Sequence, residues 1–204
     1  MITIVNYGMG NIQAFANIYK RLNVAVAIAS TPGELRAAER IILPGVGSFD
    51  WAMTLLDRSG MRDVLDELVV GRRVLVLGIC VGMQIMAKRS AEGVLKGLGW
   101  IDAEVRKFDA GSSADKIRLP HMGWNDVEPR SHDDLFRNLD SEARFYFLHS
   151  YYFAPNDERH TLAVTDYGGL YASSVRDGNI FGVQFHPEKS HQWGVQLLRN
   201  FAEL

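Results

Sequence analysis

Short apolar runs alternate with helical patterns through the first half of the chain, and this alternation constrains the fold most strongly. Residues 2–5 are apolar and β-branched, as in a buried strand, and apolar side chains then recur at helical spacing between positions 12 and 22. The same pattern predicts further strands at 24–29, 40–43 and 74–77, and helices at 32–38, 51–56, 61–70 and 81–88. Alternating strands and helices indicate right-handed crossovers and a parallel sheet that is covered on both faces.

The second half of the chain is richer in strands. Strand-forming residues gather at 97–108, 120–124, 144–153, 161–165, 170–175 and 179–185, and a final helix is expected at 193–202. The polar segment 109–116 is expected to be a mobile surface loop. The sequence therefore predicts a single α/β domain over residues 1–204. Its mostly parallel central sheet is flanked by helices and carries an additional antiparallel strand region.

Composition excludes several classes of protein. A chain of 204 residues can bury a full core without disulfides or metal, and a net charge of −2 shows no bias toward nucleic acid or anionic membranes. The single cysteine, Cys80, excludes an intrachain disulfide and a four-cysteine zinc site. The longest apolar tract, 74–86, is too short to cross a bilayer. The first residues lack the basic segment and the long apolar stretch of a secretory signal. We therefore expect a cytoplasmic protein with no metal or other cofactor.

Cys80 is the first candidate for chemistry, because it follows a predicted strand and precedes a predicted helix. In Gly78-Ile79-Cys80-Val81-Gly82 the two glycines tolerate the crowding of a sharp strand–turn–helix elbow. The start of a helix favours the thiolate, and the backbone amide of Val81 could donate to an oxyanion beside it. The alternative is a small buried cysteine. The glycines and the elbow context favour the nucleophile.

A thiolate that performs acyl transfer needs a base, and His186 is the best candidate. It follows an apolar strand in Phe185-His186-Pro187-Glu188. If the chain is extended here, His186 and Glu188 point to the same face, and Glu188 can hold the imidazole in one tautomer. The alternative is that His186 lies at the end of a strand and meets an exposed Glu188 only by chance.

A second oxyanion donor is expected from a loop after a neighbouring strand. The glycines of Pro44-Gly45-Val46-Gly47 allow the backbone amide of Val46 or Gly47 to turn inward. The alternative is an ordinary tight turn.

These three segments together resemble the class I, triad-type glutamine amidotransferases. More specifically, segments 7–11 (Tyr-Gly-Met-Gly-Asn), 120–125 (Pro-His-Met-Gly-Trp-Asn) and 149–151 (His-Ser-Tyr) resemble the glutaminase subunits of imidazole glycerol phosphate synthase. The resemblance covers essentially the whole chain. It implies a flavodoxin-like amidotransferase fold and an enzyme of histidine biosynthesis.

The resemblance also implies roles for individual residues. Cys80 would attack the side-chain amide of L-glutamine, His186 would act as base and then as acid, and Glu188 would orient His186. The substrate would be held by Gln84, Glu92, Ser150 and Tyr151. A carboxylate such as Glu92 suits the α-ammonium group of glutamine. The alternative to substrate binding is a solvated loop position for Glu92 and packing in the core for Tyr151.

The partner implied by the resemblance is a cyclase subunit with a (β/α)8 barrel, which receives the ammonia through a channel. The docking face would include Asn11, Met122, Trp124 and Lys189. Burial in the core is the alternative for Met122 and Trp124. Three other functions stay open: a related amidotransferase that supplies a surface-polysaccharide sugar synthase, a stand-alone cysteine hydrolase, and a catalytically silent binding subunit.

Overall fold

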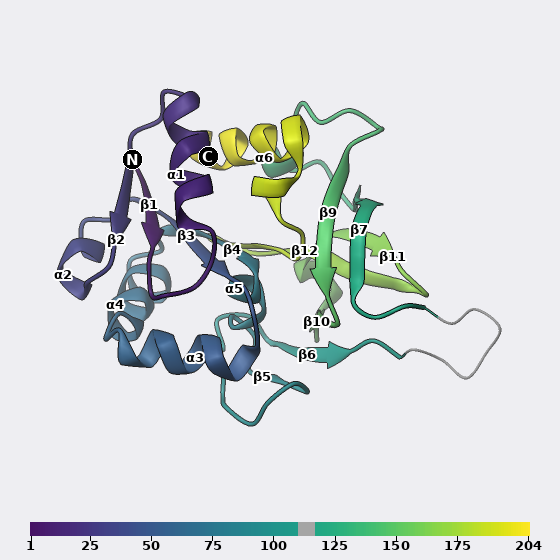
Figure 1. Cartoon of the computed structure of the whole chain (residues 1–204), viewed down its shortest axis with the longest axis horizontal. Coiled ribbons are helices and arrows are strands. Elements are labelled where there is room, and N and C mark those ends of the chain that lie inside the picture. Colours follow the sequence, from purple (N-terminus) through teal and green to yellow (C-terminus); the bar gives the residue numbers. More distant parts are fainter. Residues whose placement is uncertain (110–116) are drawn as a thin grey trace.

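The computed structural model describes residues 1–109 and 117–204, which form one large mixed sheet with helices on both faces and two small sheets beside it (Figure 1). The strands are β1 (Ile2–Val5), β2 (Val26–Ala29), β3 (Arg40–Gly45), β4 (Leu75–Cys80), β5 (Arg89–Ser90), β6 (Ala103–Lys107), β7 (His121–Asp126), β8 (Glu128–Pro129), β9 (Arg144–His149), β10 (Tyr151–Pro155), β11 (Thr161–Asp166), β12 (Leu170–Asp177) and β13 (Ile180–Val183). The helices are α1 (Ile12–Arg21), α2 (Pro32–Leu35), α3 (Phe49–Arg58), α4 (Arg62–Asp66), α5 (Val81–Gln84) and α6 (His191–Glu203), with single helical turns η1 (Glu67–Gly71), η2 (Asp134–Phe136), η3 (Glu158–His160) and η4 (Pro187–Lys189).

The large sheet has the order β2-β1-β3-β4-β13-β12-β11-β8. Its first five strands run parallel, and β12, β11 and β8 follow, each paired antiparallel with the strand before it in this order. The order of the parallel part matches the flavodoxin-like arrangement, in which ligands bind beyond the carboxyl ends of the strands. The predicted α/β fold with a mostly parallel central sheet is therefore confirmed.

Helices cover both faces of this sheet, and α1 and α6 lie on the face opposite to α3 and α4 (Figure 1). Helix α1 is amphipathic and buries Phe15, Ala16 and Tyr19. The start of α2 is fixed by a capping box between Thr31 and Glu34. No helix of the described residues is long and apolar enough to cross a membrane.

The predicted helix at 81–88 is wrong beyond its first turn, because α5 ends at Gln84. The backbone carbonyls of Ile85, Met86 and Ala87 accept hydrogen bonds from Leu98, Ile101 and Gly99, at 2.7, 3.2 and 3.1 Å. These tertiary partners replace the bonds that a continued helix would make. The chain instead enters the short strand β5.

Other predicted elements are shorter or divided. The helix at 61–70 is α4 followed by the π-helical turn η1, and the regular strand within 97–108 is β6 alone. Segment 144–153 divides at Ser150 because β9 pairs with β7, whereas β10 pairs with β6. The loop predicted at 109–116 lies, except for Asp109, outside the described residues.

Two small sheets stand beside the large one. The first has the order β10-β6-β5, and the second is an antiparallel ribbon of β7 and β9. Along β7 buried and exposed side chains alternate, so one face of the ribbon is turned to the interior and the other to the surface. This ribbon forms one wall of the site described below.

The side chain of Asn200 ties α6 to the segment around η2, and its removal should destabilise the fold. It is fully buried and donates to the carbonyls of Leu135 and Arg137, at 3.0 and 2.7 Å. Because Asn200→Ala leaves both acceptors without this donor, we expect it to lower the free energy of unfolding by about 2–3 kcal/mol. Urea titration measures this loss. Asn17→Ala is the matched control, because Asn17 is on the exposed face of α1, and it should change stability by less than about 0.5 kcal/mol. Equal effects of the two substitutions would contradict the role given to Asn200.

Candidate active site

Cys80 stands on a sharp elbow between β4 and α5. Its backbone has φ +55° and ψ −113°, a strained combination for a residue with a side chain. A Cβ on Gly82 would lie 1.9 Å from the carbonyl oxygen of Leu43, and one on Gly78 would lie 2.7 Å from the carbonyl oxygen of Gly82. Only glycine fits at these two positions. The elbow predicted from the sequence is present in the structure.

The loop after β3 lies against this elbow. A Cβ on Gly45 would lie 2.4 Å from the backbone nitrogen of Gly82, and Gly47 has φ +96°. Val46 and Gly47 line the same pocket as Cys80 and Val81. The two predicted sources of oxyanion donors are thus brought together with the thiol.

His186 and Glu188 form a buried pair behind the thiol. The distance between His186 Nδ1 and Glu188 Oε1 is 3.0 Å, and the two side chains are only 3% and 2% exposed. Burial lowers the pKa of His186, but hydrogen bonds to Cys80 and Glu188 outweigh it and raise this pKa from 6.5 to about 10. The pair therefore favours an imidazolium beside the sulfur at neutral pH.

The route by which the chain pairs these two side chains differs from the sequence prediction. We expected extended backbone, whereas residues Pro187–Lys189 form the 3-10 turn η4. Proline is compatible with the first position of a helical turn, because its missing N–H would have no partner there.

The backbone of His186 is held in turn by Ser190, which sequence reasoning missed. The Ser190 hydroxyl donates to the carbonyl of His186 at 2.6 Å and accepts from the amide of Tyr146 at 3.0 Å.

One pocket of about 540 Å³ collects the candidate residues. It is lined by Val46, Gly47, Cys80, Val81, Gln84, Glu92, Pro120, Leu148, His149, Ser150, Tyr151, His186 and Lys189. All four residues predicted to hold the substrate are among them. Glu188 is not, because it lies behind His186. The sequence analysis did not single out His149 as a lining residue.

Gln84 and Gln184 connect the pocket wall to the thiol. Gln84 Nε2 donates to the carbonyl of Tyr151 and to Gln184 Oε1, both at 3.0 Å, and Gln184 Nε2 lies 3.7 Å from Cys80 Sγ. Both glutamines are buried. Gln184 was also missed, although it is the polar residue of an otherwise apolar run directly before His186, which is the signal that could have found it.

Glu92 is held at the rim of the pocket by α3. Its Oε2 accepts from the backbone amide of Phe49 at 2.8 Å, in the first turn of that helix. Asp50 fixes the same loop by accepting from the amides of Val94 and Leu95, at 3.0 and 3.1 Å. Glu92 is therefore an ordered carboxylate and not a solvated loop residue.

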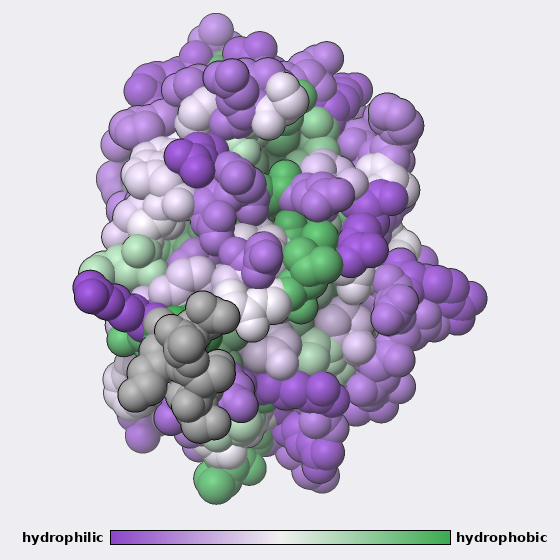
Figure 2. Space-filling view, turned by 90° about the vertical axis from the view of Figure 1, so that its right-hand side faces the viewer, coloured by the Kyte–Doolittle hydropathy of each residue, from purple (hydrophilic) through white to green (hydrophobic). Residues whose placement is uncertain are grey.

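An exposed apolar surface adjoins the pocket on the outer face of the β7–β9 ribbon. Met122, Trp124 and Leu148 are 64%, 39% and 38% exposed, which excludes the core alternative for the first two. The Trp124 ring stacks on His191 with 5.0 Å between centroids. Figure 2, which shows the right-hand side of the view in Figure 1, has hydrophobic areas within a mostly hydrophilic surface.

The two other residues expected on the docking face lie on other elements, Lys189 on η4 and Asn11 directly before α1. The ammonium group of Lys189 lies 5.6 Å from the ring centroid of Tyr146, on β9, and Lys189 also lines the pocket. Asn11 is exposed at the start of α1.

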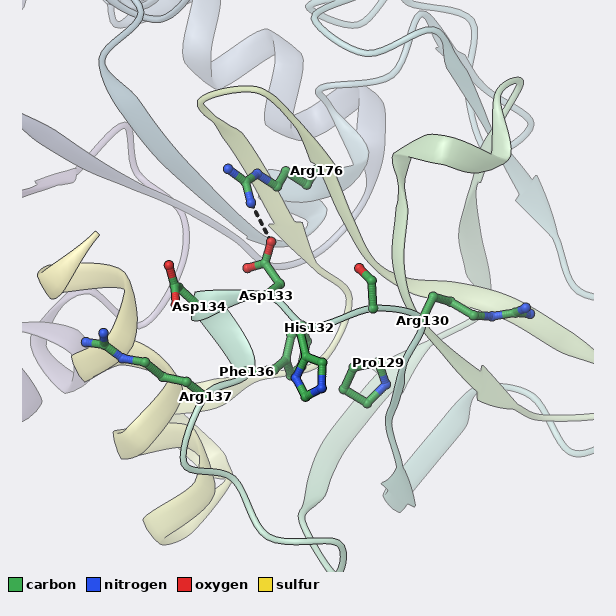
Figure 3. Close-up of a pocket in the computed structure, with 9 residues that line it drawn as sticks. Pro129, Arg130, His132, Asp133, Asp134, Phe136, Arg137 and Arg176 are labelled. Carbon is green, nitrogen blue, oxygen red and sulfur yellow. Dashed lines mark hydrogen bonds and ion pairs between the residues drawn. The ribbon is translucent and has the colours of Figure 1, made fainter.

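A second hollow of about 620 Å³, around Asp133, shares no residue with the pocket at Cys80 (Figure 3). Its charged groups are largely paired: Arg176 binds Asp133, and Arg137 binds Glu203. Within the described ranges, no group of three or more His, Cys, Asp or Glu side chains could hold a metal ion.

Comparison with known proteins identifies the family. The family of class-I glutamine amidotransferases matches residues 3–204. The chain belongs to this family.

Curated relatives narrow the assignment within the amidotransferases. Over the full length of both chains it is 54% identical to imidazole glycerol phosphate synthase subunit HisH of Bdellovibrio bacteriovorus and 50% identical to that of Leptospira interrogans. It is also 43% identical to subunit HisH 2 of Pseudomonas aeruginosa, again over both full lengths. The predicted function, the glutaminase subunit of imidazole glycerol phosphate synthase, is confirmed at this level.

Solved structures agree on the fold. A glutamine amidotransferase superposes with a TM-score of 0.76 at 22% identity, covering 99% of this chain and 97% of that one. A chain in the structure of PurLQS from Thermotoga maritima superposes with a TM-score of 0.73 at 18% identity, covering 99% and 97%.

The buried pair of His186 and Glu188 makes a pH-dependent contribution to stability that Glu188→Gln should weaken. Because the folded-state pKa of His186 is raised from 6.5 to about 10, the pair stabilises the fold fully below pH 6.5. This contribution is lost as the pH rises toward 10. In Glu188→Gln the imidazole loses its carboxylate partner, so we expect its titration to move to lower pH and the fall in stability over this range to shrink. NMR titration of His186 and urea midpoints at several pH values measure the two effects. An unchanged His186 titration would contradict the pairing.

Proposed function

We propose that Cys80, His186 and Glu188 form the catalytic triad that hydrolyses L-glutamine to glutamate and ammonia. The single observation that supports this most is the pocket in which the Cys80 elbow, its His186 partner and four substrate-binding candidates meet. Cys80 Sγ attacks the side-chain amide carbon of glutamine. The proton held by His186 passes to the amide nitrogen. Ammonia then departs, and a glutamyl thioester forms on Cys80. Water, deprotonated by His186, then attacks the thioester, which releases glutamate and restores the thiolate of Cys80 beside the imidazolium of His186.

The oxyanion of each tetrahedral intermediate would be stabilised by the backbone amides of Val81 and of Val46 or Gly47. One such donor contributes roughly 3–4 kcal/mol in comparable sites. The contact between the 45–47 loop and the elbow supports this assignment.

Substrate recognition follows from the charges and amides around the thiol. The carboxylate of Glu92 would receive the α-ammonium group of glutamine, because it is ordered at the rim and faces the pocket. Gln84, Ser150 and Tyr151 would hold the rest of the substrate at the wall formed by β10 and α5. We assign no cofactor to this reaction.

The ammonia is then delivered to a second protein. The relatives are named as subunits of a synthase, which supports a complex, and we propose a heterodimer with a cyclase subunit of (β/α)8 fold. Met122 and Trp124, on the outer side of the β7–β9 ribbon, would form the docking face together with Lys189 of η4 and Asn11 before α1. Exposed Met and Trp are enriched in such interfaces. We place the complex in the cytoplasm, as the sequence predicts.

We also propose that residues 1–204 act as a single amidotransferase domain. Strand β13 of the second half pairs with β4 of the first half, so neither half completes the large sheet alone.

Cys80→Ala should separate the two half-reactions of the complex. Without the nucleophile no thioester forms, so glutamine-dependent synthesis should fall by at least about 10³-fold. Synthesis from added ammonium salt by the cyclase should continue at the wild-type rate. Product formation with each nitrogen source, on purified and correctly assembled complex, measures both.

Two outcomes of that assay would contradict the proposal. Full glutamine-dependent activity in Cys80→Ala would exclude the triad, and loss of both activities would contradict the division of labour. Running the assay also with a synthase that modifies polysaccharide sugars distinguishes that alternative partner. Strong glutaminase activity without any partner would favour a stand-alone hydrolase.

Trp124→Ala should weaken the complex. It removes a large apolar ring from the outer face of the ribbon, and truncation of a central aromatic costs about 1–3 kcal/mol, which corresponds to a Kd raised by about 5- to 150-fold. Calorimetric titration with the cyclase measures the Kd. Val70→Ala is the control, because Val70 is 57% exposed but lies outside the docking face. Equal affinities for Trp124→Ala and wild type would remove Trp124 from the interface.

A further inference from the structure

A line of hydrogen bonds runs through the inner side of the β7–β9 ribbon to the wall of the pocket. Tyr171, on β12, stands at its centre: its hydroxyl oxygen lies 3.2 Å from His121 Nδ1 and 3.2 Å from His149 Nε2. His149 Nδ1 lies 2.8 Å from the carbonyl oxygen of Tyr151. All three side chains are buried, with at most 6% exposure. None of the three takes part in the reaction described above.

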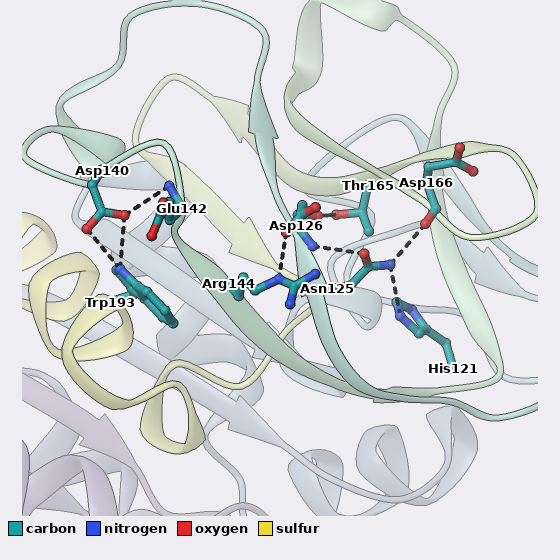
Figure 4. A network of polar contacts seen from close by, with 9 residues as sticks. All are labelled: His121, Asn125, Asp126, Asp140, Glu142, Arg144, Thr165, Asp166 and Trp193. Atoms are coloured by element: carbon teal, nitrogen blue, oxygen red, sulfur yellow. Dashed lines mark hydrogen bonds and ion pairs between the residues drawn. The ribbon is translucent and has the colours of Figure 1, made fainter.

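The outer end of the line is fixed by Asn125. Its Nδ2 lies 3.3 Å from His121 Nε2 and donates to the carbonyl of Asp166 at 2.9 Å, as Figure 4 shows. Asn125 Oδ1 accepts from the backbone amide of Asp126 at 2.8 Å, which fixes the orientation of the amide group. Asn125 therefore presents a donor to His121.

The donor of Asn125 at one end of the line and the carbonyl of Tyr151 at the other determine which atom donates in every hydrogen bond between them. A carbonyl can only accept, so His149 carries its proton on Nδ1 and accepts on Nε2. Tyr171 donates to His149 and accepts from His121 Nδ1, which leaves His121 Nε2 to accept from Asn125. The Thr165 hydroxyl, which also contacts Tyr171, uses its own proton on the carbonyl of Asp126. Every donor in the line meets an acceptor.

These hydrogen-bond directions require that His121 and His149 are uncharged, and burial favours the uncharged form of both rings. Burial lowers the pKa of His121 to about 4 and that of His149 to about 3. Both rings are therefore uncharged at physiological pH, with one donor and one acceptor nitrogen each.

The line ends on the group that positions Gln84. The carbonyl of Tyr151 accepts from both His149 Nδ1 and Gln84 Nε2, and Gln84 also holds Gln184, which reaches Cys80 Sγ. Tyr151 lies directly after Ser150, where the chain passes from β9 to β10. The peptide at this change of sheet needs side-chain partners, and His149 and Gln84 provide them.

The ribbon presents this line and the docking surface on opposite faces. His121 and Asn125 point inward from β7, whereas Met122 and Trp124, next to them in the chain, are exposed. On β9 the paired residues repeat the pattern, with His149 inward and Leu148 outward.

We propose that His121, Tyr171 and His149 are positioning residues, which hold the Tyr151 carbonyl and Gln84 in the arrangement that binds glutamine and which anchor this wall to strand β7. The proposal rests on the proposed function, because it gives Gln84 and Tyr151 the substrate. The three residues never touch the reacting atoms. They act by keeping one backbone carbonyl in one orientation.

Tyr171→Phe tests the proposal, because it removes the central hydroxyl and keeps the ring. We expect KM for glutamine, measured with the cyclase complex, to rise about tenfold, since buried groups lose their partners and the wall is held less firmly. Turnover at saturating glutamine should stay within about twofold of wild type. The rate of Cys80 alkylation by iodoacetamide should not change.

Tyr167→Phe is the matched control. The Tyr167 ring stacks on His121 with 3.8 Å between centroids, but its hydroxyl donates to the carbonyl of Arg118, outside the line. It should keep the wild-type KM. A KM in Tyr171→Phe equal to wild type would overturn the proposal, and so would equal KM increases in the two variants, which would indicate packing alone.

Nitrogen-15 NMR of the imidazoles provides a readout that needs no activity. In the wild-type protein we expect His121 and His149 both in the Nδ1–H tautomer, and in Tyr171→Phe a loss of that fixed state at His121. An Nε2–H tautomer of His149 in wild type would overturn the line of hydrogen bonds. The NMR result does not depend on the Cys80→Ala assay. The NMR tests the positioning role and the assay tests the proposed triad, so failure of one can be distinguished from failure of the other.

Discussion

The close approach of β3 and α5 is the constraint on which the site depends. The carbonyl of Leu43 occupies the space where Gly82 would carry a side chain, and a Cβ on Gly45 would lie 2.4 Å from the backbone nitrogen of Gly82. This contact forces the chain to turn within one residue at Cys80, which therefore adopts a positive φ at the end of a strand buried within a parallel sheet. The same contact brings the 45–47 loop to the thiol. The positions of the proposed nucleophile and of the proposed oxyanion donors thus both follow from a single backbone contact.

The second half of the chain supplies the proposed base, His186, and the pocket walls through its change from parallel to antiparallel pairing. Strand β13 completes the parallel part and directs the chain to His186, beyond the carboxyl end of the strands. Strands β12 and β11 then extend the sheet, and the β7–β9 ribbon beside them brings His149, Ser150 and Tyr151 to the pocket. A flavodoxin-like sheet thereby gains the wall that a small zwitterionic substrate requires.

The sequence predicted the parallel part of the fold well because each buried strand there is an apolar run and each helix has a periodic face. It failed at 81–88, where apolar residues continue with helical spacing but the carbonyls of Ile85, Met86 and Ala87 bond to a distant segment. Such tertiary competition has no local signal. The candidates Cys80 and His186 were accessible because glycines and proline mark their turns. Ser190 and His149 carry no comparable local mark, and Gln184 is marked only as a polar residue within an apolar run. Part of what each does depends on distant partners, such as Tyr146 for Ser190 and Tyr171 for His149.

The ribbon of β7 and β9 shows how a two-residue period can serve two purposes at once. Alternation along each strand places the apolar surface that we propose for docking on one side and the polar side chains of His121 and His149, which meet Tyr171, on the other. A partner that presses on Met122 and Trp124 acts on the same backbone that presents His121 and Asn125. Any shift of β7 must lengthen a hydrogen bond in the line or move the Tyr151 carbonyl, because each donor and acceptor of the line is already engaged by its neighbour. In the arrangement that we propose, docking of the partner and binding of glutamine are therefore coupled through strands β7 and β9.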